Sequence, residues 1–448
     1  MVLTQLPMKL IRWLAFALSV APGGAWAEDL VQVYRDALRF DAQYAAARHA
    51  LDAGRERLPQ GEALLLPNVG LSAAANYGDA RVKFRDPALA AANRNPQDWS
   101  YTFSLTQPIY RPDNVLRRDQ AGFAVTQAEA AYGQAGQDLI LRMAQAYFDI
   151  LAAHESRRVI RSQKRATAEQ LAQAKRNFEV GTATITDTHE AQARFDLIIA
   201  QQIAVNNDLE NKRDVLHQIT GRAYDALKDL RRDVNLSPPN PNKIETWVEL
   251  AEKQSYPVRL QSALTEIAAL EAKRGEVGHY PTLDAVASYR DFNQRDPVSL
   301  SSIGSETRQG TIGLQFAVPL YQGGAITSRE RESAANYLRA KEDLENARRS
   351  AVVAARRSFL AVTDGIEGAK ALKQALVSSR SSVESNKLGY EVGVRINIDV
   401  LNAQQQLYST RRDLAIVRYN TILNQLRLKA AAGSLTDQDL EEVNRVLH

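Results

Sequence analysis

The sequence predicts a mixed α/β membrane protein in which two β-hairpins alternate with two very long helix hairpins. Three observations support this fold class: one sequence unit occurs twice, each copy contains stretches with the two-residue period of a strand, and each copy then continues for more than 60 residues with helical spacing and no proline. The 448 residues therefore do not divide into the three side-by-side domains that about 150 residues per domain would give.

A constant offset relates the two copies of the unit. The segment 178–181 (FEVG) is matched 212 residues later by 390–393 (YEVG), and Gly221 is matched by Gly433 at the same offset. Upstream, with a small slip, 106–110 (TQPIY) corresponds to 317–321 (AVPLY). Repeats of this size indicate one supersecondary unit used twice.

The repeat divides the chain into five segments. In chain order they are a signal peptide at 1–27, a first structural repeat at 28–221 (strand hairpin at about 67–110, helix hairpin at about 113–221), an equatorial linker at 222–243, a second structural repeat at 244–433 (strand hairpin at about 281–321, helix hairpin at about 327–433) and a C-terminal tail at 434–448.

The first 27 residues have the pattern of a cleaved export signal. Lys9 and Arg12 flank or interrupt an apolar stretch at 10–20, and Ala25 and Ala27 place small residues ahead of the expected cleavage point. The alternatives are a signal anchor and a buried helix, but the apolar run is too short to span a bilayer. Cleavage removes two basic and no acidic residues, so the formal net charge falls from +4 to +2.

Four stretches alternate apolar side chains with small or polar ones. They begin near Val69, Tyr101, Leu283 and Ile312, and each runs for about ten residues, the length at which a tilted strand crosses an outer membrane. We expect two hairpins with loops at about 78–98 and 291–308. Because barrel closure takes about eight strands, several chains must contribute to one barrel, and three chains would supply twelve strands.

The long helices follow the strand hairpins. Asp113 is a plausible N-cap for a proline-free segment that reaches residue 178, and 327–388 repeats this pattern. A helix of about 63 residues would be about 95 Å long, so it needs packing partners along its whole length. A second helix is expected to turn back after Gly181 in the first copy and after Gly393 in the second.

Enzymatic chemistry finds no support in the sequence. There is no cysteine, the six histidines lack metal-ligand spacing, and no nucleotide-binding or nucleophile motif occurs. We therefore expect no catalytic residue, no metal and no cofactor. Nucleic-acid binding, indicated by the sequence pI of about 9.0 and by arginine pairs such as Arg157 with Arg158, is disfavoured because the signal exports the protein and acids nearly balance bases. The remaining alternative is an exported periplasmic coiled-coil structural or adaptor protein, which would need no membrane-length strand hairpins.

These residues resemble the TolC family of outer-membrane efflux and secretion channels. The resemblance is carried by 390–395 (YEVGVR), 398–401 (IDVL), 406–408 (QLY) and 432–435 (AGSL), together with both strand hairpins, and it covers essentially residues 28–440. It implies a homotrimer whose twelve-stranded antiparallel outer-membrane β-barrel, with four strands per chain, is continuous with a long periplasmic α-helical barrel.

The resemblance also implies a function and a set of partners. The channel would be the outer-membrane exit duct of a Gram-negative bacterium, embedded in outer-membrane lipid and with no role in nucleic-acid binding. It would act with a periplasmic adaptor (membrane fusion) protein and an inner-membrane ABC, RND or MFS transporter. Small molecules, proteins or both would leave through it, as in multidrug efflux and type I secretion, and untwisting of the helix hairpins would gate the entrance.

Several positions match the entrance residues of the family. Tyr390 and Arg395 match the donors of a gating hydrogen-bond network, and Thr186 and Asp187 match its acceptors, a pairing in which a guanidinium donates several bonds to a carboxylate.

Asp399 matches a carboxylate that rings the narrowest point, where three symmetry-related charges would favour cations. Asn402 stands where the family has a second ring, so we expect a less negative constriction. For Asp187 and Asp399 the plainer interpretation is helix capping alone.

One family contact is not expected to form in the same way. It joins Gln170 to a carboxylate on the second copy, but Lys387 occupies the matching position in this sequence. The closed latch is therefore expected to differ in detail from that of the family.

Overall fold

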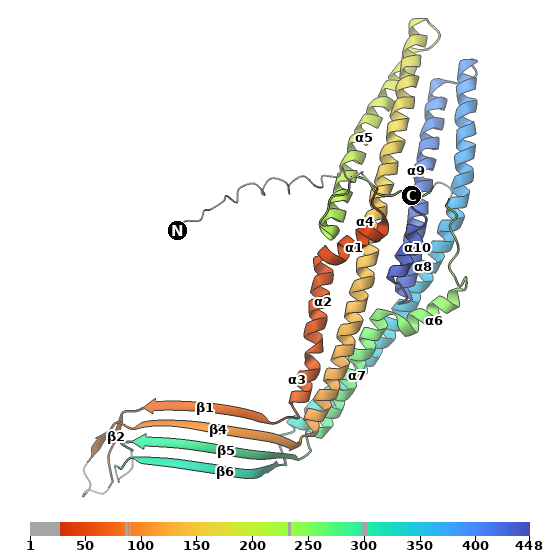
Figure 1. Cartoon of the computed structure of the whole chain (residues 1–448). Helices are drawn as coiled ribbons and strands as arrows, with labels where there is room; N and C mark the ends of the chain where they lie inside the picture. The colour runs from red at the N-terminus through yellow and green to blue at the C-terminus, as the bar shows by residue number, and fades with distance from the viewer. Residues whose placement is uncertain (1–26, 86–87, 89–90, 232–233, 298–302) are drawn as a thin grey trace, which may run out of the picture.

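The computed structural model describes residues 27–85, 88, 91–231, 234–297 and 303–448, so the predicted signal peptide lies outside the described residues except for Ala27. The protein is elongated: a β-sheet occupies one end, and long helices run from it to two hairpin tips at the opposite end (Figure 1). Within the described ranges, none of the helices combines the length and the apolar character needed to cross a membrane.

The main sheet has four antiparallel strands in the order β1 (Asn68–Tyr77), β4 (Gln97–Tyr110), β5 (Thr282–Arg295) and β6 (Ser305–Ala317). Two short strands, β2 (Ala80–Val82) and β3 (Ala92–Arg94), pair beyond the end of β1. Pairing of β4 with β5 joins the two predicted hairpins into one sheet.

The second strand loop is shorter than the 291–308 we expected from the sequence. Strand pairing continues outward, with Asp291 opposite Arg308 and Gln294 opposite Ser305. The Arg308 Nε donates to Asp291 Oδ2 at 3.1 Å, so polar side chains support the strand ends. Apolar alternation misses these residues because Phe292 is the only apolar side chain among residues 291–295 and 305–308.

One face of the sheet carries a continuous apolar surface. Residues directly opposite one another in neighbouring strands share a face, and the register places Leu71 opposite Phe103, Phe103 opposite Tyr289, and Ala287 opposite Ile312. In the single chain Leu71 is 73% exposed and Ile312 is 92% exposed. A continuous apolar face that spans four strands is unfavourable in water and indicates a surface that contacts lipid or another protein.

Four long helices form the two hairpins: α4 (Pro112–Glu179) with α5 (Ile185–Thr220), and α8 (Ala325–Glu391) with α9 (Asn397–Ala431). The helix α4 passes through Gly133 and Gly136 without interruption. Its N-cap is Arg111 and not Asp113 as predicted, because Pro112, whose fixed φ suits the first helical position, starts the helix two residues earlier.

Shorter helices pack along the half of the long helices nearer the sheet. Of these, α2 and α3 lie against α4, whereas α7 lies against both α4 and α8 (Figure 1). Among the described residues, the shorter helices are α1 (Leu30–Phe40), α2 (Ala42–Arg55), α3 (Arg57–Ala63), α6 (Ile244–Gln254), α7 (Tyr256–Val277) and α10 (Asp437–Asn444).

The largest hydrophobic core lies midway along the molecule, where α1 and α10 pack against α4, α5 and α9. Tyr147 and Phe148 of α4 are almost completely buried there, together with Leu440 of α10. The segment that follows α5 also joins this core through Leu230, which forms an isolated antiparallel bridge with Leu447. The linker and the C-terminal tail therefore lie side by side around the middle of the helices.

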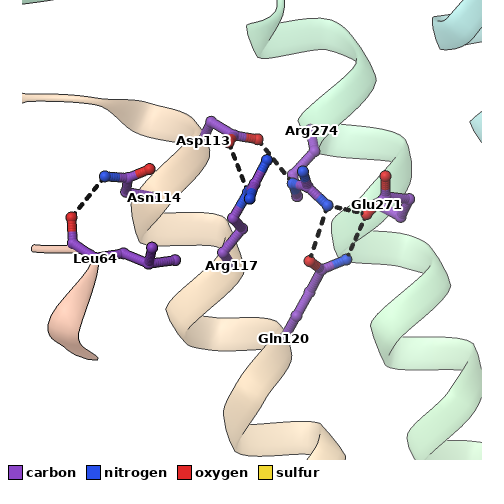
Figure 2. Close-up of polar contacts among 7 residues, drawn as sticks. All are labelled: Leu64, Asp113, Asn114, Arg117, Gln120, Glu271 and Arg274. Atoms are coloured by element: carbon purple, nitrogen blue, oxygen red, sulfur yellow. Dashed lines mark hydrogen bonds and ion pairs between the residues drawn. The ribbon is translucent and has the colours of Figure 1, made fainter. Parts of the chain in front are cut away.

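Polar contacts fix the junction between helices and sheet. Arg274 of α7 donates from Nε to Asp113 Oδ1 at 2.8 Å and also contacts Glu271, while Gln120 of α4 donates to Glu271 Oε2 at 2.9 Å (Figure 2). This cluster ties the first repeat's long helix to the helix that precedes the second strand hairpin.

At the base of the strands, Arg111 forms a two-pronged contact with Asp284 of β5. Its Nε and Nη2 donate to the two carboxylate oxygens at 2.8 and 2.6 Å, and Asp284 is only 4% exposed. Bidentate pairs of this kind fix orientation as well as distance. The direction in which α4 leaves the sheet is therefore set by the neighbouring strand.

Candidate functional site at the helix-hairpin tips

The two hairpin tips have the same backbone turn. Gly181 and Gly393 adopt φ values of +77° and +80°, in the left-handed region that favours glycine. After each glycine the chain folds back onto the preceding helix: the Thr182 N–H donates to the Asn177 carbonyl at 2.8 Å, and the Val394 N–H donates to the Gly389 carbonyl at 2.9 Å. Matching turns end both long helices at this end of the molecule.

Neither acidic residue beyond the turns is the N-cap itself, but Asp187 takes part in capping α5, as the plainer interpretation expects, whereas Asp399 makes no cap bond. Thr184 is the N-cap of α5, and Asp187 lies three residues later in a capping box, with the Thr184 N–H donating to Asp187 Oδ2 at 3.0 Å. Ile396 is the N-cap of α9 and has no capping side chain, and Asp399 lies in the first turn. A carboxylate in the first turn still complements the helix dipole.

The structure places the predicted network residues close to the tips but does not join donors to acceptors within one chain. The Tyr390 hydroxyl accepts from Asn177 Nδ2 of α4 at 3.2 Å. Arg395 Nη1 lies 3.7 Å from Asp399 Oδ2. Asp187 bonds with Thr184 of its own turn, and Thr186 is exposed. The pairing of Tyr390 and Arg395 with Thr186 and Asp187 therefore stays a prediction.

The family contact of Gln170 is replaced by a different one. Gln170 Nε2 donates to Asn397 Oδ1 at 2.5 Å, and Asn397 Nδ2 donates to the Asp187 backbone carbonyl at 3.2 Å. Asn397 is fully buried, and no motif marked it in the sequence. The signal that could have found it is an asparagine between Ile396 and Ile398, since a polar side chain within an apolar stretch needs a buried partner.

Asn402 is held from the other hairpin. Arg194 of α5 donates from Nη2 to Asn402 Oδ1 at 3.0 Å and from Nη1 to Gln405 Oε1 at 2.8 Å. The resemblance to the family indicates Asn402 but not Arg194. The guanidinium introduces positive charge one helical turn from the Asp399 carboxylate, which further reduces the negative character of this region.

The tips therefore carry charged side chains and hydrogen bonds between the helices. The Asp399 side chain is 34% exposed and can interact with solute. In the part of the chain that the structure describes, no group of three or more His, Cys, Asp or Glu side chains is placed to hold a metal ion.

The long helix hairpins, the strand sheet with its exposed apolar face and the polar tips define the class of outer-membrane channel proteins. Residues 33–222 and 254–434 match the family model described as "Outer membrane efflux protein". The chain belongs to this family, which includes the TolC proteins.

Similarity to individual proteins extends over nearly the whole chain. The chain is 32% identical to the outer membrane protein TolC of Vibrio cholerae serotype O1, over 96% of each of the two chains. It is also 32% identical to the proteases secretion protein PrtF of Dickeya chrysanthemi, over 96% of this chain and 93% of that protein. The solved structure of the outer membrane protein VceC from Vibrio cholerae superimposes with a TM-score of 0.75 and 17% identity over 90% of this chain and 96% of that one. The protein is therefore an outer-membrane channel with a periplasmic tunnel.

Proposed function

We propose that the chain is one subunit of a homotrimeric exit duct that exports small molecules, proteins or both across the outer membrane. The observation that carries this proposal is the exposed apolar face of the four-stranded sheet, on which Leu71 is 73% exposed and Ile312 is 92% exposed. Such a face is stable against lipid, and the open edges of β1 and β6 require further strands. Three copies would supply a closed twelve-stranded antiparallel barrel.

We also propose that residues 28–221 and 244–433 are two copies of one structural repeat, joined by the 222–243 linker and followed by the 434–448 tail. Element lengths support this: α4 and α8 have 68 and 67 residues, and α5 and α9 have 36 and 35. Matching lengths let both hairpins reach the same depth. Three chains, each with four long helices, would then contribute twelve helices to a long periplasmic α-helical barrel.

The cargo and partners are inferred from the relatives. PrtF is named as a protease secretion protein, and another relative is the outer membrane efflux protein BepC of Brucella suis. By extension, this channel would take its cargo from an inner-membrane ABC, RND or MFS transporter through a periplasmic adaptor (membrane fusion) protein. Those partners would supply the energy for transport.

The tips would form the gated entrance. Asp399 would ring the constriction, with Asn402 one turn away, and Tyr390 and Arg395 would bond to Thr186 and Asp187 when the hairpins coil together. Thr186 is exposed and the Arg395 side chain is 60% exposed, so both are accessible to another hairpin. Untwisting at the Gly181 and Gly393 turns would open the entrance.

Cell fractionation and chemical cross-linking test the proposal. We expect the mature protein in the outer membrane as a trimer on a cross-linking gel, and we expect cation-conducting channels when it is reconstituted in planar bilayers. A soluble monomer in the periplasmic fraction would instead support the alternative of an exported coiled-coil structural or adaptor protein and would overturn the channel.

A further inference from the structure

Asn397 joins the two helix hairpins of one chain. It is the first residue of α9 and is fully buried. Its Oδ1 accepts from Gln170 of α4 at 2.5 Å, and its Nδ2 donates to the carbonyl of Asp187 at the start of α5 at 3.2 Å. One amide group therefore contacts both helices of the first hairpin.

The surroundings make these two bonds difficult to replace. A cluster of buried apolar side chains, Leu171, Ala174, Ala191 and Leu401, packs at the same level, and Gln170 is only 5% exposed. In such an environment water does not compete for the bonds, and an amide left unpaired carries its full desolvation penalty. The hairpins cannot separate here without losing both bonds or admitting water.

Other polar links join α9 to the first hairpin: the Tyr408 hydroxyl donates to the Ser162 carbonyl of α4 at 3.3 Å, and Arg411 Nε lies 3.4 Å from Glu155 Oε1 of α4. The links from the side chain of Arg194 in α5 are different in kind from the buried amide. The bonds from Arg194 to Asn402 and Gln405 lie on the exposed side of the hairpins. Exposed polar and charged contacts contribute little because solvent competes with them. The buried amide is therefore the stronger of the two connections between α5 and α9.

We propose that Asn397 is a positioning residue of the entrance: it holds the two hairpins of each chain together in the closed state and so fixes the first turn of α9, which carries Asp399. This inference rests on the proposed function as a gated channel. In the family, the contact expected for Gln170 is with a carboxylate, but Lys387 occupies the position of that carboxylate in this chain. The buried, neutral pair of Gln170 and Asn397 takes the place of that contact. We call the two bonds of Asn397, with Gln170 and with the Asp187 carbonyl, the joint. The joint does not touch the transported solute but acts through the position of α9.

Single-channel conductance of the reconstituted trimer tests the joint. Asn397→Ala removes both bonds and should shift the ratio of closed to open entrances by roughly tenfold or more, seen as a severalfold rise in conductance. Gln170→Ala removes one bond and should have a smaller effect. The double variant should conduct no more than Asn397→Ala, because both substitutions break one joint.

Asn386→Ala is the matched control. Asn386 is a half-buried asparagine near the end of α8 whose side chain donates to Ser382 of its own helix and not to the other hairpin, so its removal should leave conductance unchanged. If Asn397→Ala does not assemble, Asn397→Asp takes its place: it keeps the acceptor for Gln170 and loses the donor to Asp187, and an intermediate rise in conductance is expected.

The outcomes distinguish failure of the contact at Asn397 from failure of the channel function. Wild-type conductance in whichever Asn397 variant assembles, or equal rises for Asn386→Ala and Asn397→Ala, overturns the joint while leaving the channel intact. Additive effects of Gln170→Ala and Asn397→Ala overturn it as well. A wild-type protein that forms no channel overturns the proposed function and this inference together.

Discussion

The Arg194 guanidinium lies 3.0 Å from Asn402 Oδ1, so the residue at the position of a second acidic ring is tied to the opposite hairpin of its own chain. A cation and an amide thus occupy the level next to Asp399. This arrangement makes the charge of the proposed constriction depend on three side chains, and each can be changed separately.

Asp399 should be the main site of block by multivalent cations. We expect a trivalent cation to block the wild-type channel only weakly, because one ring of three carboxylates faces the solute. Asp399→Ala should abolish that block in single-channel recordings. Block that is unchanged in Asp399→Ala would remove the assignment of Asp399 to the constriction.

A second acidic ring can be introduced at Asn402. Asn402→Asp alone should strengthen the block only modestly, because Arg194 pairs with the new carboxylate and neutralises it. Asn402→Asp combined with Arg194→Met should strengthen the block further. Equal blocking concentrations for the single and double variants would show that Arg194 does not control this charge.

Loss of the predicted donors should open the entrance. Tyr390→Phe removes the hydroxyl that accepts from Asn177, and Arg395→Ser removes the guanidinium beside Asp399. The double variant is expected to raise single-channel conductance severalfold. An unchanged conductance would falsify the gating assignment, and trimer formation on a cross-linking gel controls for misfolding.

Asp41 should stabilise the middle of the helical region. It caps α2 and accepts from Arg142 Nη1 and Nη2 at 3.0 and 3.1 Å, so Asp41→Asn should lower the free energy of unfolding by about 1–3 kcal/mol at pH 7. Thermal unfolding followed by helical circular dichroism measures this loss. Asp52→Asn, at an exposed site on the same helix, is the matched control and should have little effect.

The effect of Asp41 should depend on pH. Burial alone would raise the pKa of this carboxyl, but the Arg142 bonds and the Tyr44 backbone N–H hold its pKa below the ordinary value of 3.8. A lowered pKa contributes stability above pH 3.8 that is lost as the pH falls through the folded-state value. The difference between wild type and Asp41→Asn should therefore shrink below pH 3.8. A constant difference down to pH 2 would contradict this origin of the stability.

The mature chain should begin at Glu28. Backbone bonds already engage this residue, since its N–H donates to the Ala226 carbonyl and its carbonyl accepts from the Lys228 N–H, both at 3.0 Å. Mass spectrometry of the protein from outer membranes should give an N-terminus at Glu28. A peptide that contains Lys9 or Arg12 in that fraction would show that the signal is retained.

The sequence by itself determined the strands, the long helices and the turns. These elements have local signals: a two-residue apolar period for the strands, a proline-free stretch for the helices, and Gly181 or Gly393 for the turns. The signals are local because backbone geometry and the burial of one face act within a few residues. Resemblance to a family added the candidate entrance residues. Local signals also failed locally: apolar alternation ends where every side chain of the paired ends of β5 and β6 except Phe292 is polar, and Pro112 displaced the expected cap at Asp113.

Only the tertiary structure decided which polar groups meet at the tips. Gln170 and Asn397 are 227 residues apart, and Arg194 and Asn402 are 208 residues apart. A buried asparagine needs a hydrogen-bond partner, but the sequence of the chain does not identify that partner, because its identity depends on how the two long hairpins lie against each other. The fold was therefore predictable from the pattern of the chain, whereas the buried joint at Asn397 followed only from the packing of α4, α5 and α9.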